Sequence, residues 1–181
     1  MTYQELIDRY YPADTLRRAI YLKHCRAVAD LALEIARARG LSLDEDDIEG
    51  AAMLHDIGIC MTDAASIDCH GTEPYIRHGI LGAEIMRREG MPEIYARVAE
   101  RHTGAGITRE EVEAQGLPLP TDVSYMPETV LERLICYADK FYSKSGDMRR
   151  KPFDKVVASM EKLSQASKER FMTLNGEFGP Q

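Results

Sequence analysis

The sequence has no tryptophan, few aromatic residues and no long apolar run, and each absence narrows the classes of protein that it can represent. Aromatic residues make up 7% of the 181 residues, whereas 44% are hydrophobic and 29% are charged. This balance is typical of a globular chain and argues against disorder of the whole protein. The longest apolar runs are far too short to cross a bilayer, so we expect no membrane partner.

The chain also lacks an excess of positive charge, a paired-cysteine motif and a secretory signal. Its net charge is -7 and no run of Lys and Arg offsets it, so we expect no duplex nucleic acid as a partner. Its four cysteines show no CxxC spacing, and the N-terminal stretch "MTYQELIDRY" has no apolar signal segment. These absences predict a cytoplasmic protein with reduced thiols.

Hydrophobic periodicity is helical almost throughout, and no segment alternates as a half-buried strand would. We therefore predict an all-α fold in a single domain over residues 1–181, with a core at about 19–143 and a C-terminal helical extension at about 152–178. The expected helices span residues 2–10, about 13–39, 44–57, 77–89, 93–102, 108–115, 127–142 and 155–178. Residues 61–75 show no clean period and are expected to form a loop.

Several ionisable side chains fall on the apolar faces of these helices. They are His24, His55, His78, His102 and Asp139, and Asp56 directly follows His55. Burying one such group without a partner costs about 2–7 kcal/mol, and an unpaired carboxylate costs more. Each one alone has a plain explanation as a hydrogen-bonded core residue or a helix cap. Together they are explained more economically by one metal centre.

His70 lies in the expected loop, where no apolar stripe would bury it. It is either an exposed loop histidine or a group that hangs over the site as a proton donor or substrate contact, and we keep it as a candidate catalytic residue. The adjacent pair Cys69-His70 resembles part of a zinc site, but no second matching pair accompanies it. We therefore expect no separate zinc site there.

The ordered set of His24, "HDIG" at residues 55–58 and Asp139 in "YADK" resembles the H…HD…D signature of the HD-domain superfamily. Most members of this superfamily are metal-dependent phosphohydrolases built as all-α helical bundles, and the resemblance covers about residues 19–143. The stretches "RHGILGAEIMRREG" and "ERHTGAGIT" resemble the branch with a two-metal site. "GLPLP" and "LICYADKF" resemble a subgroup of small HDIG proteins.

The resemblance implies two divalent metal ions. His24, His55, Asp56 and Asp139 would bind one of them, and His78, His102 and the bridging carboxylate of Asp56 would bind the other. A ligand set of nitrogen and oxygen atoms favours Fe, Mn, Zn, Co or Ni over Ca or Mg, and Fe or Mn is our first expectation. Ile59-Cys60 follow HDIG where HD-GYP cyclic dinucleotide phosphodiesterases carry a Lys, and GYP is absent, which argues against that activity.

Four cations stand directly beside expected ligands: Lys23 beside His24, Arg77 beside His78, Arg101 beside His102 and Lys140 beside Asp139. Adjacent residues on a helix diverge by about 100°, so these side chains are expected at the rim of the pocket. There they would bind the phosphate oxygens of a small anionic substrate, unless they are only solvated flanks of the helices.

The leading hypothesis is a metal-dependent phosphohydrolase that hydrolyses a nucleotide or another small phosphate ester through a metal-bridging hydroxide, with Asp56 as the bridging catalytic residue. A di-iron oxygenase of the HD-domain type is the first alternative, because it would use a similar ligand set. A non-catalytic, metal-stabilised ligand-binding module is the second. The sequence leaves the substrate, the metal, the general acid and a homodimer open.

Overall fold

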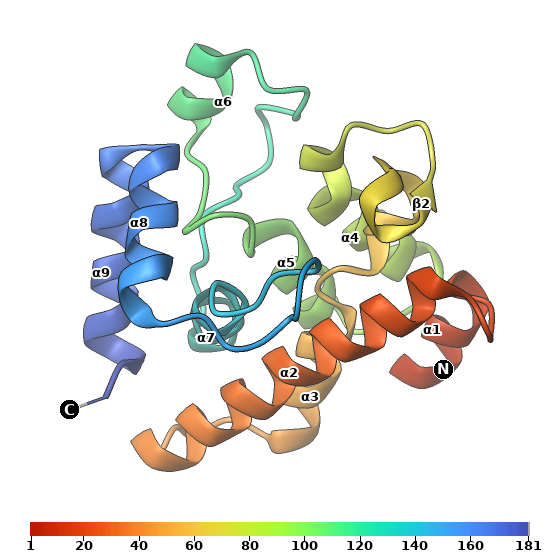
Figure 1. Cartoon of the computed structure of the whole chain (residues 1–181), viewed down its shortest axis with the longest axis horizontal. Helices are drawn as coiled ribbons and strands as arrows, with labels where there is room; N and C mark the ends of the chain where they lie inside the picture. The colour runs from red at the N-terminus through yellow and green to blue at the C-terminus, as the bar shows by residue number, and fades with distance from the viewer. Residues whose placement is uncertain (181) are drawn as a thin grey trace.

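The computed structural model describes residues 1–180, which form nine α-helices, three 3₁₀ helices and one small antiparallel sheet (Figure 1). The α-helices are α1 (Tyr3–Tyr10), α2 (Leu16–Arg39), α3 (Glu45–Leu54), α4 (His78–Arg88), α5 (Glu93–Arg101), α6 (Arg109–Gln115), α7 (Val130–Asp139), α8 (Phe153–Leu163) and α9 (Gln165–Phe178). The 3₁₀ helices are η1 (Ile57–Met61), η2 (Ala65–Ile67) and η3 (Tyr75–Arg77). The predicted all-α class is confirmed. Within residues 1–180, no helix combines the length and apolarity that a bilayer span needs.

The long helix α2 runs along one side of the molecule and packs against α3 and α7 (Figure 1). The Thr15 side chain accepts a hydrogen bond from the Arg18 N–H and so caps the start of α2, and Gly40 ends it with a φ of 60°. That left-handed conformation suits glycine because it has no Cβ. Both ends of the helix are thus set by local sequence, and its buried face includes His24.

Two hydrophobic clusters form the main core. One is built mainly by α2, α7 and α9 and contains Leu134 and Phe171, whereas the other is built by α1, α3 and α4 and contains Leu54 and Ile85. Helices α2, α3 and α5 contribute side chains to both clusters. Full burial of one such side chain contributes about 1.5–3 kcal/mol, so the clusters hold these helices in fixed positions relative to one another.

A close backbone contact joins η1 to the start of α4 at Gly58. A Cβ atom added at Gly58 would lie 2.2 Å from the carbonyl oxygen of His78 and 2.4 Å from the backbone nitrogen of Gly82. No side chain fits into that space, so only glycine permits the two segments to approach so closely. The contact brings Asp56, which precedes η1, next to the N-terminus of α4.

The helical stretch predicted over residues 155–178 is helical, but the structure divides it into α8 and α9 at Ser164. Ser164 has an extended backbone, with φ -172°, and its side chain accepts a hydrogen bond from the Ser167 N–H. A serine that caps a following helix competes with helix continuation. The two helices therefore form a hairpin, drawn in blue in Figure 1, whose Phe171 ring stacks on Tyr137 of α7 at 5.4 Å.

The loop predicted over residues 61–75 also contains regular structure. Strand β1 (Asp63–Ala64) pairs with β2 (Cys69–His70) in antiparallel register, and η2 connects them. Two-residue strands are too short to show an alternating pattern, which explains why they could not be predicted from the sequence. Strand β2 contacts η1, and η2 contacts α2, the helix that carries His24.

Candidate metal centre

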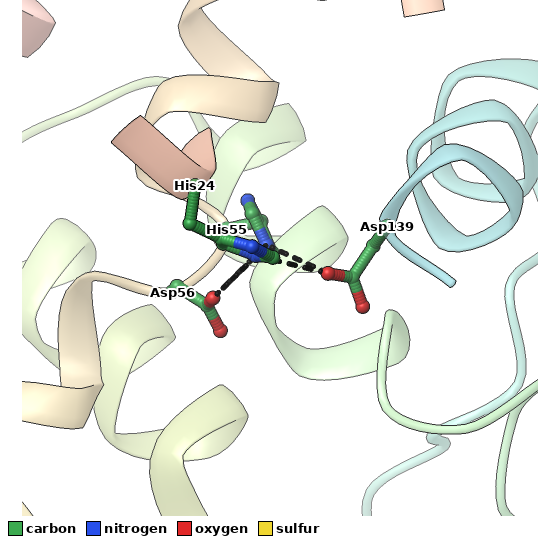
Figure 2. A group of neighbouring side chains, drawn as sticks. All are labelled: His24, His55, Asp56 and Asp139. Atoms are coloured by element: carbon green, nitrogen blue, oxygen red, sulfur yellow. Dashed lines mark hydrogen bonds and ion pairs between the residues drawn. The ribbon is translucent and has the colours of Figure 1, made fainter. Parts of the chain in front are cut away.

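Six buried ionisable side chains meet in the interior of the bundle. They are His24, His55, Asp56, His78, His102 and Asp139, all at most 7% exposed. His24 comes from the middle of α2, while the others stand at helix ends: at the ends of α3, α5 and α7 and at the starts of η1 and α4. Figure 2 shows four of them pointing toward one another. The structure thus brings together every residue predicted as a metal ligand.

The first group consists of His24, His55, Asp56 and Asp139, whose ligand atoms all lie within 4.8 Å of one another. The Nε2 atom of His24 lies 3.0 Å from Oδ1 of Asp139 and 3.2 Å from Oδ2 of Asp56. The Nε2 atom of His55 lies 3.1 Å from the same Asp56 oxygen. Two imidazoles and two carboxylates around one point form a mixed nitrogen and oxygen donor set, which suits a transition metal.

The second group consists of Asp56, His78 and His102. Here the other carboxylate oxygen of Asp56, Oδ1, faces His102 Nε2 at 3.3 Å and His78 Nε2 at 3.5 Å. Asp56 therefore presents one oxygen to each group, which is the arrangement that a carboxylate bridging two cations requires. Two metal ions about 3.5–4 Å apart are a recurrent arrangement in phosphoryl-transfer sites.

Backbone carbonyl groups orient three of the four histidines. The Nδ1 atom of His55 lies 2.6 Å from the Ala52 carbonyl oxygen. The Nδ1 atoms of His78 and His102 lie 2.7 and 2.8 Å from the carbonyl oxygen of the residue three positions earlier in the chain. A carbonyl oxygen only accepts, so each Nδ1 must carry a proton. In the neutral rings the Nε2 atom then carries a lone pair that points into the site, as is typical of metal-binding histidines.

The charges in the site favour a bound cation. Burial acts to raise the pKa of Asp56, but His55 and Lys144 outweigh it and hold that pKa well below its ordinary value. The pKa of Asp139 is likewise lowered, because Lys140 and Lys144 outweigh its burial. Neither Asp56 oxygen accepts a hydrogen bond with suitable geometry, and His24 Nδ1 has no hydrogen-bond partner. Buried, ionised oxygens that lack a well-directed hydrogen-bond donor fit a divalent metal ion.

Lys144 is a charged residue of the site that the sequence interpretation missed. It lies in the segment between α7 and α8, and its Nζ is 2.7 Å from Oδ2 of Asp56 although the side chain is 18% exposed. Burial disfavours its charged form, but Asp56 and Asp139 outweigh this effect and raise its pKa above the ordinary value. Lys144 falls outside the helical periodicity that identified the ligands, so no pattern in the sequence pointed to it.

The four cations predicted at the rim have different surroundings. Lys140 is buried and pairs with Oδ2 of Asp139 at 2.7 Å, while Arg101 is buried and lies 2.7 Å from Glu128. Arg77 is paired with Glu73 at 2.8 Å, and exposed Lys23 donates to the Asp147 carbonyl oxygen at 3.3 Å. All four have other polar partners, so their contact with substrate stays a prediction.

His70 does not join the buried ligands. It lies on β2 with its side chain 65% exposed, and its Nε2 is 3.2 Å from Oδ1 of Asp68. The Asp68 contact restrains the ring at the surface of the small hairpin. Its role as proton donor or substrate contact therefore stays a prediction.

The HD domain family model matches residues 21–143, and the chain belongs to this family. The uncharacterized protein MJ0778 of Methanocaldococcus jannaschii is 38% identical over 162 residues, which is 86% of each chain. A protein of Thermoplasma volcanium named tRNA (cytidine(56)-2'-O)-methyltransferase is 32% identical over 171 residues, covering 94% of this chain but 44% of that one. The chain thus spans less than half of that methyltransferase.

Among solved structures, the HD domain of the L. monocytogenes phosphodiesterase PgpH resembles the chain with a TM-score of 0.56 and 17% sequence identity. The match covers 97% of this chain and 98% of that domain. The same domain in complex with cyclic-di-AMP gives a TM-score of 0.55 at 16% identity. This likeness shows the fold, while the match to the HD domain family model confirms the family that the ordered histidines and aspartates indicated.

Proposed function

We propose that the chain is a metal-dependent phosphohydrolase that acts on a nucleotide or another small phosphate ester. The observation that carries the proposal is the position of Asp56, whose two carboxylate oxygens face two different pairs of histidines. Membership of the HD domain family and the fold shared with a phosphodiesterase domain support it. A single carboxylate between the two histidine pairs can be a ligand of two neighbouring cations.

His24, His55, Asp56 and Asp139 would hold one metal ion, and Asp56, His78 and His102 would hold the second. When bound, divalent metal ions at such a site polarise phosphoryl oxygens and lower the pKa of a coordinated water. The donor set favours Mn, Fe, Co, Ni or Zn. The protein supplies the rest through the orientation, charge and burial of its own side chains.

The surrounding contacts keep the donor atoms in the required state. The carbonyl oxygens behind His55, His78 and His102 hold each ring in one orientation. Lys140 binds Oδ2 of Asp139 and leaves Oδ1 toward His24. Burial of the six side chains excludes bulk water, which strengthens the electrostatic interaction with a bound phosphoryl group.

The decisive experiment measures metal content and turnover together. Protein loaded with Mn or Fe should release phosphate or nucleoside from a panel of nucleotides, dinucleoside polyphosphates and sugar phosphates. Asp56→Ala should abolish both metal retention and turnover, whereas Asp30→Ala, which removes an exposed carboxylate from α2, should change neither.

Other results would replace the proposal. Retention of about two metal ions per chain without turnover across the panel would favour the non-catalytic module. Oxygen consumption by the iron-loaded protein, together with a mixed-valent iron signal, would favour the oxygenase. The oligomeric state, measured in the same preparations by light scattering, tests the homodimer that the sequence left open.

A further inference from the structure

A recess of about 500 Å³ adjoins the candidate metal centre on the side of the small hairpin. Its walls come from β1, η2, η3 and the segment after α7, and they include Ile67, Tyr75 and Lys144. This volume is within the range of about 300–1,000 Å³ that is usual for small-molecule sites. The recess differs from the metal centre in position, but Lys144 belongs to both.

Lys144 connects the two regions. Its side chain lines the recess while its ammonium lies 2.7 Å from Oδ2 of Asp56, the carboxylate between the two histidine pairs. A phosphoryl group that contacts the metal centre while its ester substituent extends into the recess must lie close to this ammonium group. A lysine ammonium is a point charge on a flexible stem, which suits a phosphate whose oxygens shift during reaction.

Tyr75 forms a wall of the recess beside the candidate ligand His78. Its ring stacks on His78 with centroids 4.7 Å apart and stays 39% exposed, so one face is covered and part of the ring is accessible. An aromatic ring with a protonated hydroxyl can pack against a cyclic group and donate a hydrogen bond to it.

The recess is lined by side chains of opposite charge. Lys144 supplies a cation at the metal end, whereas Asp63 on β1 supplies a carboxylate, and the hydroxyls of Ser66 and Ser143 are neutral. A second phosphate group in this recess would come near Asp63, which is exposed, and like charges repel. Hydroxyl groups of a sugar would instead find acceptors and donors there.

We propose that Lys144 is a substrate-binding residue that contacts the phosphoryl oxygens, and that the recess holds the uncharged, hydroxyl-bearing leaving group of a phosphomonoester. This inference rests on the proposed phosphohydrolase function and adds its substrate class. In the reaction, water adds to phosphorus, the bond from phosphorus to the ester oxygen breaks, and the leaving group departs as an alcohol after gaining one proton. Nucleoside monophosphates and sugar monophosphates meet these requirements.

The first test removes the charge of Lys144. With a nucleoside 5'-monophosphate as probe, Lys144→Gln should raise KM by about 10- to 100-fold, because one charge-assisted contact is lost, while metal content stays at the wild-type value. Lys144→Arg should recover most of the loss. Lys155→Gln, which removes an exposed lysine from α8, is the matched control and should change neither KM nor metal content.

The second test separates this inference from the proposed function. Calorimetry should show that inorganic phosphate binds the manganese-loaded Lys144→Gln protein about 10- to 100-fold more weakly than the wild type, whether or not any ester is hydrolysed. Wild-type protein without turnover would overturn the proposed function alone. Equal phosphate affinity in the two proteins would overturn the role of Lys144.

The third test concerns the leaving group and does not depend on the folding of the Lys144 variants. Asp63→Asn should raise kcat/KM for a nucleoside diphosphate relative to the monophosphate by about fivefold, because one repulsive charge is removed. Wild-type protein should prefer the monophosphate. A preference for the diphosphate, or no change in the ratio on substitution, would overturn the assignment of the recess.

Discussion

The Nε2 atoms of His78 and His102 lie 3.0 Å apart in the interior of the protein. Each ring also contacts a backbone carbonyl oxygen through Nδ1, so in the neutral rings both facing nitrogens are lone pairs. Two lone pairs cannot hydrogen-bond to each other. The contact between the two rings is favourable only with a cation between or beside them. We therefore expect this histidine pair to hold a metal ion.

We predict that the two histidine pairs hold different metal ions. His78→Ala should lower the manganese content from about two ions per chain to about one, because the group around His24 and His55 is left complete. His24→Ala should also leave about one ion. Elemental analysis of dialysed protein measures this, and His70→Ala is the control because His70 is exposed and outside both groups. Loss of both ions on removal of His78 would show that the sites are not separable.

The acid sensitivity of the metal-free protein is a second prediction. Burial, aided by His102, lowers the pKa of His78 to about 3 from an ordinary value of 6.5. Between pH 3 and 6.5 the His78 side chain is protonated in the unfolded chain but not in the folded chain. The contribution of His78 to the free energy of unfolding is therefore fully present above pH 6.5 and falls as the pH decreases toward 3. The loss for this one group is about 1.4 kcal/mol per pH unit.

Urea unfolding of metal-free wild type and His78→Gln at pH 7, 6 and 5 tests this expectation. The wild type should lose more stability on acidification than the variant. The comparison with a variant is needed because His55 acts in the opposite direction: burial disfavours its charged form, but Asp56 outweighs burial and raises its pKa. Parallel pH profiles for the two proteins would contradict the prediction.

Gly58 gives a third prediction. Gly58→Ala would place a Cβ 2.2 Å from the His78 carbonyl oxygen, so η1 and α4 must move apart, at a cost of about 1–3 kcal/mol. Because Asp56 precedes η1 and His78 begins α4, the variant should also bind the second metal ion more weakly. Thermal unfolding and metal titration measure the two effects. Gly176→Ala is the control, since a Cβ there meets no atom within 4 Å.

A fourth prediction distinguishes two roles for Arg101. This side chain is buried and lies 3.3 Å from Oε2 of Glu132, which is itself 2% exposed. Arg101→Gln should therefore lower the unfolding free energy by about 1–3 kcal/mol, because a buried carboxylate loses one of its partners. Lys23→Gln, at an exposed position, should leave stability unchanged. A higher KM for Arg101→Gln without loss of stability would support substrate binding instead.

Much of the fold follows from local sequence. The helical periodicity predicted most α-helices to within a few residues, because the alternation of buried and exposed positions along a helix is local. Thr15 and Thr129, which cap α2 and α7 in the structure, show that the exact helix starts are also set by nearby residues. The division between α8 and α9 was missed because Ser164 is equally acceptable inside an amphipathic pattern. Its extended conformation depends on the packing of both helices against the core.

The candidate ligands could be predicted because polar groups on apolar helix faces need partners. Their division into two groups came only from the family resemblance, because helix periodicity does not show how the helices cross. The sequence contains nothing to show that Oδ2 of Asp56 faces His24 while Oδ1 faces His102. Nor does it show that Arg101 is directed to Glu132, since a long side chain has many rotamers and its partner lies 31 residues away.

The sequence by itself determined the helical class, the family and the identity of six buried polar side chains, because helix periodicity is local and repeats every 3.6 residues. Only the tertiary structure decided how close together these side chains lie, which oxygen of Asp56 faces which histidine pair, and that Lys144 reaches Asp56 from a non-helical segment. Such contacts arise from the burial of apolar surface between distant helices, which fixes where each helix ends relative to the others.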